Sequence, residues 1–72
     1  MEETVHVTTI IINQVSLDGL RECAVRCDKS GCFQAVVYEN VYGCWSITHE
    51  SKPTRARNKA MAAFRRFAAK YL

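Results

Sequence analysis

The first hydrophobic segment of the chain is rich in β-branched residues, which favour extended backbone. Residues 4–12 are Thr-Val-His-Val-Thr-Thr-Ile-Ile-Ile, and this composition predicts a strand. Because successive side chains of a strand point to opposite faces, the inward positions are expected to be Val5, Val7 and then either Ile10 or Ile11.

The second segment has its apolar residues at helical spacing. Ser16 is a suitable N-cap, and Asp18 would lie in the first turn, where a negative charge suits the helix dipole. Gly31 is expected to end this helix in a left-handed conformation. We therefore predict a helix from Ser16 to about Asp28, with an apolar face formed by Leu17, Leu20, Cys23, Ala24 and Cys27.

Two segments with an alternating pattern follow and predict a β-hairpin. Residues 32–39 and 43–50 are the expected strands, and residues 40–42 form the short loop that Gly43 closes. Both faces of these strands carry apolar residues, so the pattern leaves open which face packs against the helices.

The last segment is alanine-rich and has neither Gly nor Pro after Pro53. Pro53 would end the preceding strand, and Thr54 is a suitable N-cap for a helix over residues 55–71. The face expected to pack on the sheet holds Ala56, Ala60, Ala63, Phe64, Phe67, Ala68 and Tyr71. A stripe on nearly the opposite face holds Arg55, Lys59, Ala62, Arg66 and Lys70.

These elements predict an α+β fold of order βαββα, a three-stranded antiparallel sheet with two helices packed on one face. The chain has 72 residues, and we expect residues 1–72 to form a single domain. A domain of this size buries only roughly 60% of the surface that its unfolded chain exposes. A deep substrate pocket is therefore not expected.

The charge of the chain is unevenly distributed. Lys and Arg number 10 against 7 Asp and Glu, a formal net charge of +3, yet residues 52–70 hold seven basic residues and no acidic one. This concentration of positive charge favours an acidic partner.

The N-terminal sequence and the apolar runs bear on the cellular compartment. The chain begins Met-Glu-Glu, without the basic and apolar regions of a signal peptide, and its longest apolar run, Ile10–Ile12, is too short for a bilayer. We therefore expect a cytoplasmic protein that makes no membrane contact and keeps its cysteines as thiols.

The four cysteines, Cys23, Cys27, Cys32 and Cys44, leave three interpretations open. As thiols they would be small buried hydrophobic residues, which is the interpretation we favour. Four thiolates would also suit a structural zinc ion, although neither close pair has the usual C-x2-C spacing. The third interpretation is two disulfides, and pairing Cys23 with Cys44 and Cys27 with Cys32 would join the helix to the hairpin.

The cysteine-containing segment ECAVRCDKSGCFQAVVYENVYGCWSI also resembles the core of PAN/apple domains. That core has a helix with C-x3-C, a short loop, a third Cys, an aromatic strand and a fourth Cys followed by Trp. The resemblance implies a disulfide-stapled extracellular module that binds proteins or carbohydrates.

No arrangement of nucleophile, base or metal ligands indicates catalysis, so we expect a non-enzymatic protein that needs no cofactor and no metal. The leading hypothesis is a small interaction protein, an accessory regulator or inhibitor, that binds an acidic protein surface. The residues expected to contact the partner are Arg55, Lys59, Arg66 and Lys70 of the basic helix and Tyr42 and Trp45 of the hairpin.

Two further modes of binding are considered. Residues 51–72 are similar in pattern to the last helix of double-stranded-RNA-binding domains, where lysines meet phosphates and an alanine face packs on a sheet. RNA or DNA binding is therefore the alternative function. An edge strand with free backbone groups would also allow a homodimer.

Overall fold

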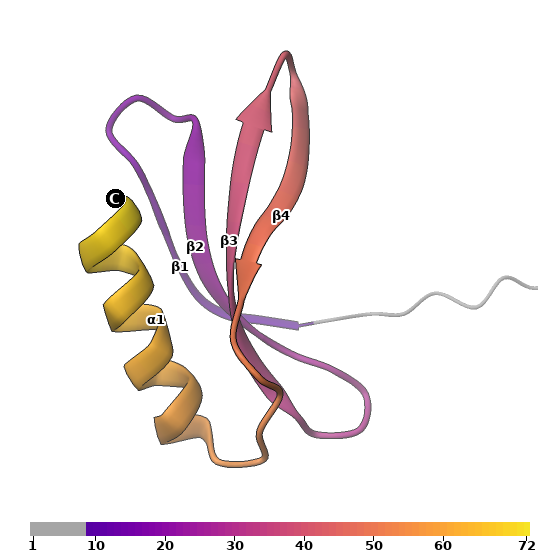
Figure 1. Cartoon of the computed structure of the whole chain (residues 1–72). Coiled ribbons are helices and arrows are strands. Elements are labelled where there is room, and N and C mark those ends of the chain that lie inside the picture. Colours follow the sequence, from indigo (N-terminus) through magenta and orange to yellow (C-terminus); the bar gives the residue numbers. More distant parts are fainter. Residues whose placement is uncertain (1–8) are drawn as a thin grey trace, which may run out of the picture.

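The computed structural model describes residues 9–72. The predicted strand at residues 4–12 therefore lies partly outside the described residues, and with it Val5 and Val7. Within residues 9–72 the sheet is a four-stranded antiparallel meander whose strands lie in sequence order, and the helix crosses one of its faces (Figure 1). The elements are β1 (Thr9–Val15), β2 (Arg21–Cys27), β3 (Phe33–Val41), β4 (Cys44–Glu50) and α1 (Arg57–Tyr71).

The predicted βαββα order is wrong, because the segment expected to form the first helix contains strand β2. Cys23, Ala24 and Val25 are all fully buried in this strand. A helix with the predicted apolar face would have left Val25 off that face. As a strand between β1 and β3, the segment satisfies its backbone groups on both sides and buries all three side chains.

A tight loop takes the place of the predicted start of the helix. Ser16 does not cap a helix: its backbone N–H donates to the carbonyl of Arg21 at 2.9 Å, and its hydroxyl accepts the Arg21 N–H at 3.1 Å. Gly19 has φ +74°, which a residue with a side chain rarely adopts. Gly31 also has a positive φ, as predicted, but it belongs to the β2–β3 loop.

The first strand is shifted relative to the prediction and contains an irregularity. The pairing of β1 with β2 changes register between Ile10 and Ile12, so the intervening Ile11 is an extra residue on the β1 side. Ile11 packs against the core, whereas Ile10 is largely exposed. Of the two inward positions predicted for this part of the strand, the structure selects Ile11.

The predicted hairpin is confirmed, with slightly different bounds. β3 and β4 pair antiparallel up to Val41 and Cys44, so only Tyr42 and Gly43 form the turn. Both turn residues have positive φ, 55° for Tyr42 and 82° for Gly43, as in a type I′ turn. A second register shift at β4 leaves Thr48 as an extra residue near the end of that strand.

The closing helix and its buried face are confirmed, but the helix starts two residues later than predicted. Ala56 is the N-cap residue and makes no side-chain cap. Thr54, the predicted N-cap, instead accepts the Ala56 N–H on its hydroxyl at 3.0 Å. No helix in the described part of the chain is long and apolar enough to cross a membrane. The core between helix and sheet consists of Cys23, Val25, Ala35, Val37, Ala60, Ala63 and Phe64.

Candidate binding groove

An open groove lies between α1 and the connector that leads from β4 into it. Its volume is about 480 Å³, which falls in the range of roughly 300–1,000 Å³ that is usual for ligand sites. It is lined by Ser51, Lys52, Pro53, Thr54, Lys59, Ala60, Ala63, Arg66 and Phe67. We call this feature the basic groove.

The connector forms a fixed rim because it is hydrogen-bonded to the start of β3. The Phe33 N–H donates to the Thr54 carbonyl at 2.6 Å, and the Thr54 N–H donates back to the Phe33 carbonyl at 2.9 Å. Ser51 makes a similar pair with Ala35, donating its N–H to the carbonyl and accepting the Ala35 N–H on its hydroxyl, both at 2.9 Å. The connector thus continues the line of β4 along β3, which keeps the groove open beside the helix.

The walls of the basic groove carry positive charge and its floor is apolar. Lys59 and Arg66 are two helical turns apart on the same side of α1, a separation of about 10 Å along the helix axis at 1.5 Å per residue. Lys52 comes from the connector on the opposite rim. The floor consists of helix residues that also belong to the core or pack against it, namely Ala60, Ala63 and Phe67.

No carboxylate of the described chain neutralises these cations. The ion pairs within residues 9–72 are Arg21–Glu39, at 3.3 Å, and Arg26–Glu50, at 3.8 Å. None of the seven basic residues between positions 52 and 70 takes part in either pair. The positive potential of the groove is therefore available to an external anionic group.

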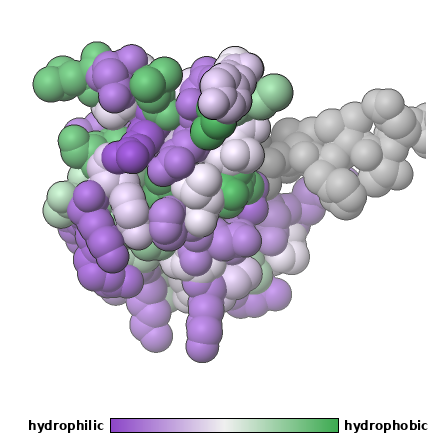
Figure 2. Space-filling model, turned by 45° about the horizontal axis from the view of Figure 1, so that its top comes forward, coloured by the Kyte–Doolittle hydropathy of each residue, from purple (hydrophilic) through white to green (hydrophobic). Residues whose placement is uncertain are grey.

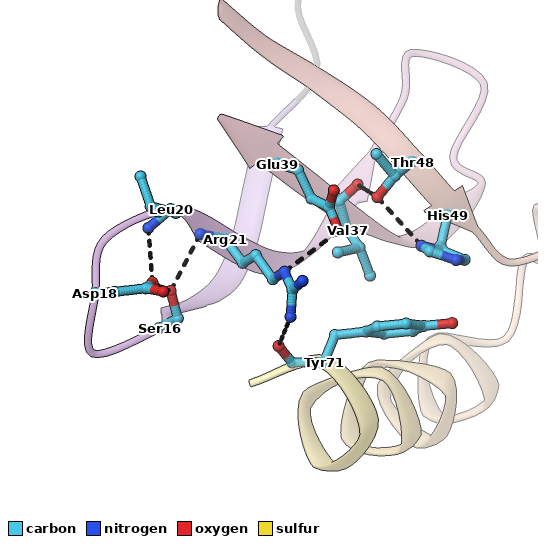
Figure 3. A network of polar contacts seen from close by, with 9 residues as sticks. All are labelled: Ser16, Asp18, Leu20, Arg21, Val37, Glu39, Thr48, His49 and Tyr71. Carbon is cyan, nitrogen blue, oxygen red and sulfur yellow. Dashed lines mark hydrogen bonds and ion pairs between the residues drawn. The ribbon is translucent and has the colours of Figure 1, made fainter. Parts of the chain in front are cut away.

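Stacked aromatic rings adjoin the groove on the side of β4. The ring centre of His49 lies 4.3 Å from that of Tyr71, with the two rings stacked at an angle of 27°, and 6.5 Å from the ring centre of Phe67. The Lys70 ammonium lies 5.4 Å from the centre of the Tyr71 ring. His49 Nδ1 also lies 3.1 Å from the Thr48 hydroxyl (Figure 3). These contacts place the end of β4, at His49, beside the last two turns of α1.

The structure brings together three of the four predicted basic residues. Lys59, Arg66 and Lys70 lie along one edge of α1, and the first two line the groove. Arg55 is separate from them, because it precedes the helix and donates from its guanidinium to the Ser30 carbonyl at 3.1 Å. Arg55 thus holds the β2–β3 loop against the start of the helix.

The two predicted aromatic residues lie away from the groove. Tyr42 is fully exposed at the tip of the β3–β4 hairpin, at the opposite end of β4 from the connector. Trp45 pairs with Asn40, and its side chain lies on the face of the sheet away from α1, which we call the open face. The single surface expected from the sequence is therefore two separate surfaces.

Exposed apolar side chains gather at the end of the molecule formed by the two hairpin loops. Figure 2 shows green side chains toward this end, with purple ones over most of the rest of the view. The large hydrophobic residues exposed at this end are Val15, Leu17, Leu20, Val41, Tyr42 and Trp45. Apolar exposure of this kind is typical of surfaces that contact other proteins.

The β1–β2 loop holds its apolar side chains outward through a polar network (Figure 3). The Asp18 carboxylate accepts hydrogen bonds from the Ser16 hydroxyl and, at 3.0 Å, from the Leu20 N–H. The bond from Ser16 and then that from Leu20 hold the pKa of Asp18 below its usual value. The Arg21 guanidinium donates to the Tyr71 carbonyl at 3.3 Å and so ties this loop to the end of α1.

Sequence reasoning missed the roles of Lys52 and Phe67 in the groove. Lys52 was counted only among the seven basic residues of positions 52–70, and Phe67 was expected only to pack on the sheet. The signal for Lys52 was its position beside Pro53, which ends the strand and turns the chain toward the helix. The shape of the groove itself depends on the pairing of Thr54 with Phe33, which no local pattern indicates.

All four cysteines are free thiols in this structure. Burial raises the pKa of the Cys23 thiol. Within residues 9–72 no three His, Cys, Asp or Glu residues lie close enough to hold a metal ion. The helix with C-x3-C on which the resemblance to PAN/apple domains depends is strand β2, in which Cys23 and Cys27 are separated by about 13 Å of extended backbone.

Comparisons with known proteins place the chain in no family. No family model matches the sequence, and no curated protein or solved structure matches it significantly.

Proposed function

We propose that this chain is a non-enzymatic binding protein that holds an acidic segment of a partner protein in its basic groove. The observation that carries the proposal is the combination of cationic walls, an apolar floor and the absence, among the described residues, of a carboxylate that pairs with the cations of the groove. Glutamate or aspartate side chains would pair with Lys59, Arg66 and Lys52, and neighbouring apolar side chains would cover Phe67.

The placement of the aromatic residues favours a protein over single-stranded nucleic acid. Proteins that bind single strands combine cations with free aromatic faces on which bases stack. Here the rings beside the groove, Tyr71 and His49, are already stacked on each other. The most exposed aromatic residues, Tyr42 and Trp45, lie at the far end of β4 and on the open face.

The length of the cationic stripe also suits a short peptide segment. From Lys59 to Lys70 the helix rises by about 16 Å, enough for about five residues of extended peptide. A regulator or inhibitor that captures a short acidic motif of its target fits these dimensions.

The experiment is a binding titration with a double charge reversal and a matched control. A fluorescent twelve-residue peptide of alternating Glu and apolar residues is titrated with the wild type, with Lys59→Glu/Arg66→Glu and with Arg57→Glu/Arg65→Glu. Both variants change the net charge equally, but only the first alters the groove. We expect the groove variant to weaken binding at least about tenfold, or about 1.4 kcal/mol, and the control by less than about threefold.

Salt dependence and a competing ligand complete the test. Binding of the acidic peptide should weaken as salt rises from 50 to 300 mM, because screening reduces each charge contact. A single-stranded RNA or DNA oligonucleotide that binds more tightly than the peptide would overturn the proposal in favour of a nucleic-acid module. Equal losses in both double variants would show that net charge, and not the groove, attracts the peptide.

A further inference from the structure

Strand β4 is an edge of the sheet, and one side of its backbone is free. The strand order places β4 last, with β3 as its one neighbour among the described strands (Figure 1). The regular part of this strand, Cys44–Ile47, comes before the shift in register and is exposed at every residue. Such an edge offers N–H and C=O groups to another extended chain.

The free backbone groups of this segment belong to Trp45 and Ile47. The N–H of Asn40, which is opposite Trp45 on β3, donates to the Leu20 carbonyl at 2.8 Å and so points toward β2. Asn40 and Trp45 therefore form a pair without mutual hydrogen bonds. Because the two kinds of pair alternate along antiparallel strands, Ser46 bonds to β3, whereas the groups of Trp45 and Ile47 point away from the sheet.

The side chains of the segment carry no charge. Trp45 and Ile47 lie on the open face and are 48% and 39% exposed, and the small Ser46 between them points to the other face. Proteins usually protect an edge with Lys, Pro or a charge that points inward, and Cys44–Ile47 has none of these. The bulge at Thr48 comes after this segment and limits regular pairing to it.

This segment is complementary to itself. When two copies pair antiparallel with their Ser46 residues opposite each other, Trp45 of each copy is opposite Ile47 of the other. These residues carry the free groups, so the two pairs form four hydrogen bonds across the edge. Trp45 and Ile47 also pack as aromatic and β-branched neighbours on the open face, a combination that stabilises sheets.

We propose that two copies of this chain dimerise by pairing their β4 strands antiparallel about Ser46, which joins the two sheets into one of eight strands. A second copy satisfies the outward groups of both Trp45 and Ile47 in a single register. It also gathers these side chains from both copies into one apolar cluster around the symmetry axis. This inference is independent of the proposed function.

The helices and the basic grooves are compatible with this arrangement. α1 packs mainly on β2 and β3, so its axis lies about two strand spacings, or about 10 Å, from the line where the two sheets meet. The two helix axes are then about 20 Å apart on one face, about twice the distance of packed helices. The groove lies beside the connector, at the other end of β4 from the hairpin, and the two connectors point in opposite directions. Each dimer therefore presents two separate basic grooves.

The first experiment is sedimentation equilibrium of the full chain at protein concentrations from about 1 µM to about 1 mM. A paired segment of four residues gives a small interface, below about 1,200 Å², so we expect a dissociation constant on the order of 10–100 µM. The average mass should rise over this range from 8.2 kDa toward twice that value. A mass that stays at 8.2 kDa at the highest concentration overturns the proposal.

A matched pair of charge substitutions tests which edge is used. Ile47→Lys places a charge beside Trp45 of the second copy and should weaken dimerisation at least about tenfold. The control is Ile10→Lys, the same change on the open face of β1, where Ile10 is 47% exposed. We expect the control to change the dissociation constant by less than about twofold. A loss in Ile10→Lys that equals or exceeds that in Ile47→Lys contradicts dimerisation through β4.

A disulfide across the symmetry axis tests the register. The two Ser46 residues would form a non-hydrogen-bonded pair with Cα atoms about 4.5 Å apart, which is within the range of about 4.4–6.8 Å found for disulfides. Cys44→Ser/Ser46→Cys should therefore form a covalent dimer with oxidised glutathione. The wild type is the control, because its exposed Cys44 would lie about 13 Å along the strands from that of the second copy.

The rates of cross-linking decide the outcome. We expect the wild type to form the covalent dimer at least about tenfold more slowly than the double variant. A wild type that cross-links as fast or faster would overturn the register centred on Ser46. None of these measurements uses an acidic peptide, so a failure of the dimer leaves the proposed function intact, and a failure of peptide binding leaves the dimer intact.

Discussion

The two faces of the sheet are built from alternate residues of the same strands, yet they differ in almost every physical respect. The face under α1 holds Val25 and Val37 in contact with Phe64, and this cluster is the core. No helix of residues 9–72 covers the open face, which carries large apolar residues such as Trp45 and Ile47 that are still substantially exposed. The contrast separates residues that stabilise the fold from residues that are free to bind.

Between these extremes, the centre of the open face is also buried. Ala24 and Val36 are opposite each other on β2 and β3, and both have no exposed surface although no helix in the described part of the chain covers them. The next pair on the same face has longer side chains, Arg26 and Gln34, and the Arg26 guanidinium donates to the Gln34 side chain at 2.9 Å. A side chain of this molecule can therefore be fully buried either beneath the helix or among neighbouring side chains of the open face. Truncating the side chain should reduce the free energy of unfolding by different amounts in the two cases.

The largest effect is expected from removing the aromatic residue at the centre of the helix–sheet contact. Phe64→Ala should lower the free energy of unfolding by about 3–5 kcal/mol, because it leaves a cavity that the small core cannot close. Ile47→Ala on the open face should cost less than about 1 kcal/mol, since this side chain is already partly in water. Urea denaturation of both variants measures the difference, and equal losses would break the contrast between the faces.

Two fully buried valines on opposite faces give a more stringent comparison. Val25→Ala should cost about 2 kcal/mol, because two methyl groups leave a packed site beneath the helix. Val36→Ala should cost about half as much, because the neighbouring side chains can relax and water can fill the space. Thermal unfolding by calorimetry separates the two values. A larger loss for Val36→Ala would mean that the open face is a second core.

Two arginines sharpen the comparison at the level of polar contacts. Arg21→Ala removes the pair with Glu39 and the bond to the Tyr71 carbonyl, both on the helix side. Because this pair is partly exposed to water, the cost should be about 0.5–1 kcal/mol, with faster amide exchange in the last turn of α1. Arg26→Ala on the open face should cost a similar amount and leave exchange in that turn unchanged.

The smallest effect is expected from a loop that belongs to neither face. Asp28 accepts hydrogen bonds from the Ser30 hydroxyl at 2.6 Å and the Cys32 N–H at 3.0 Å, which lower its pKa below the unfolded value of 3.8. Between these two pKa values the unfolded chain binds more protons. The contribution of Asp28 to stability is therefore complete above pH 3.8 and is lost as the pH falls through the lower folded value.

The measurement is the melting temperature between pH 2 and pH 6 for the wild type and for Asp28→Asn. We expect the wild type to lose more stability than the variant as the pH falls through this window. Asp18 has the same kind of shift, caused first by the Ser16 hydroxyl and then by the Leu20 N–H, and Asp18→Asn should behave in the same way. Parallel curves would show that neither carboxylate contributes through its ionisation.

Local sequence patterns were sufficient to predict about half of the fold. The hairpin of β3 and β4 follows from strand alternation on either side of a short loop ending in Gly43, and α1 follows from a long periodic segment without Gly or Pro. The buried face of α1 was predicted from periodicity alone, and Ala60, Ala63 and Phe64 are indeed buried.

The segment of β2 could not be assigned by pattern because it satisfies two periodicities. Leu20, Cys23 and Cys27 fit a helix, whereas Cys23, Val25 and Cys27 fit a strand. The deciding signal was the dipeptide Asp18-Gly19, which favours a hairpin turn over the first turn of a helix. The pairing of β2 with β1 and β3 then outweighs its helical pattern. This pairing is a long-range effect that the local sequence does not contain.

The candidate site also has one part that local sequence patterns predict and one part that they do not. The alignment of Lys59, Arg66 and Lys70 on one helix edge was predictable, since it depends only on the helical repeat. The opposite rim at Lys52 was not, since it depends on where the connector runs. Sequence analysis also predicted that Tyr42 and the cations contact the same partner, and the path of β4 separates them in the structure.

The turn of the β3–β4 hairpin has a consequence for engineering the molecule. Tyr42 adopts φ +55°, a conformation that Asn or Gly would accept with less strain. Tyr42→Asn should therefore increase the stability of the hairpin while removing a fully exposed ring. Selection for stability alone would therefore not retain tyrosine at position 42. The Tyr42→Asn protein, which keeps the fold but lacks the ring at the hairpin tip, would therefore test in a living cell whether Tyr42 contributes to function.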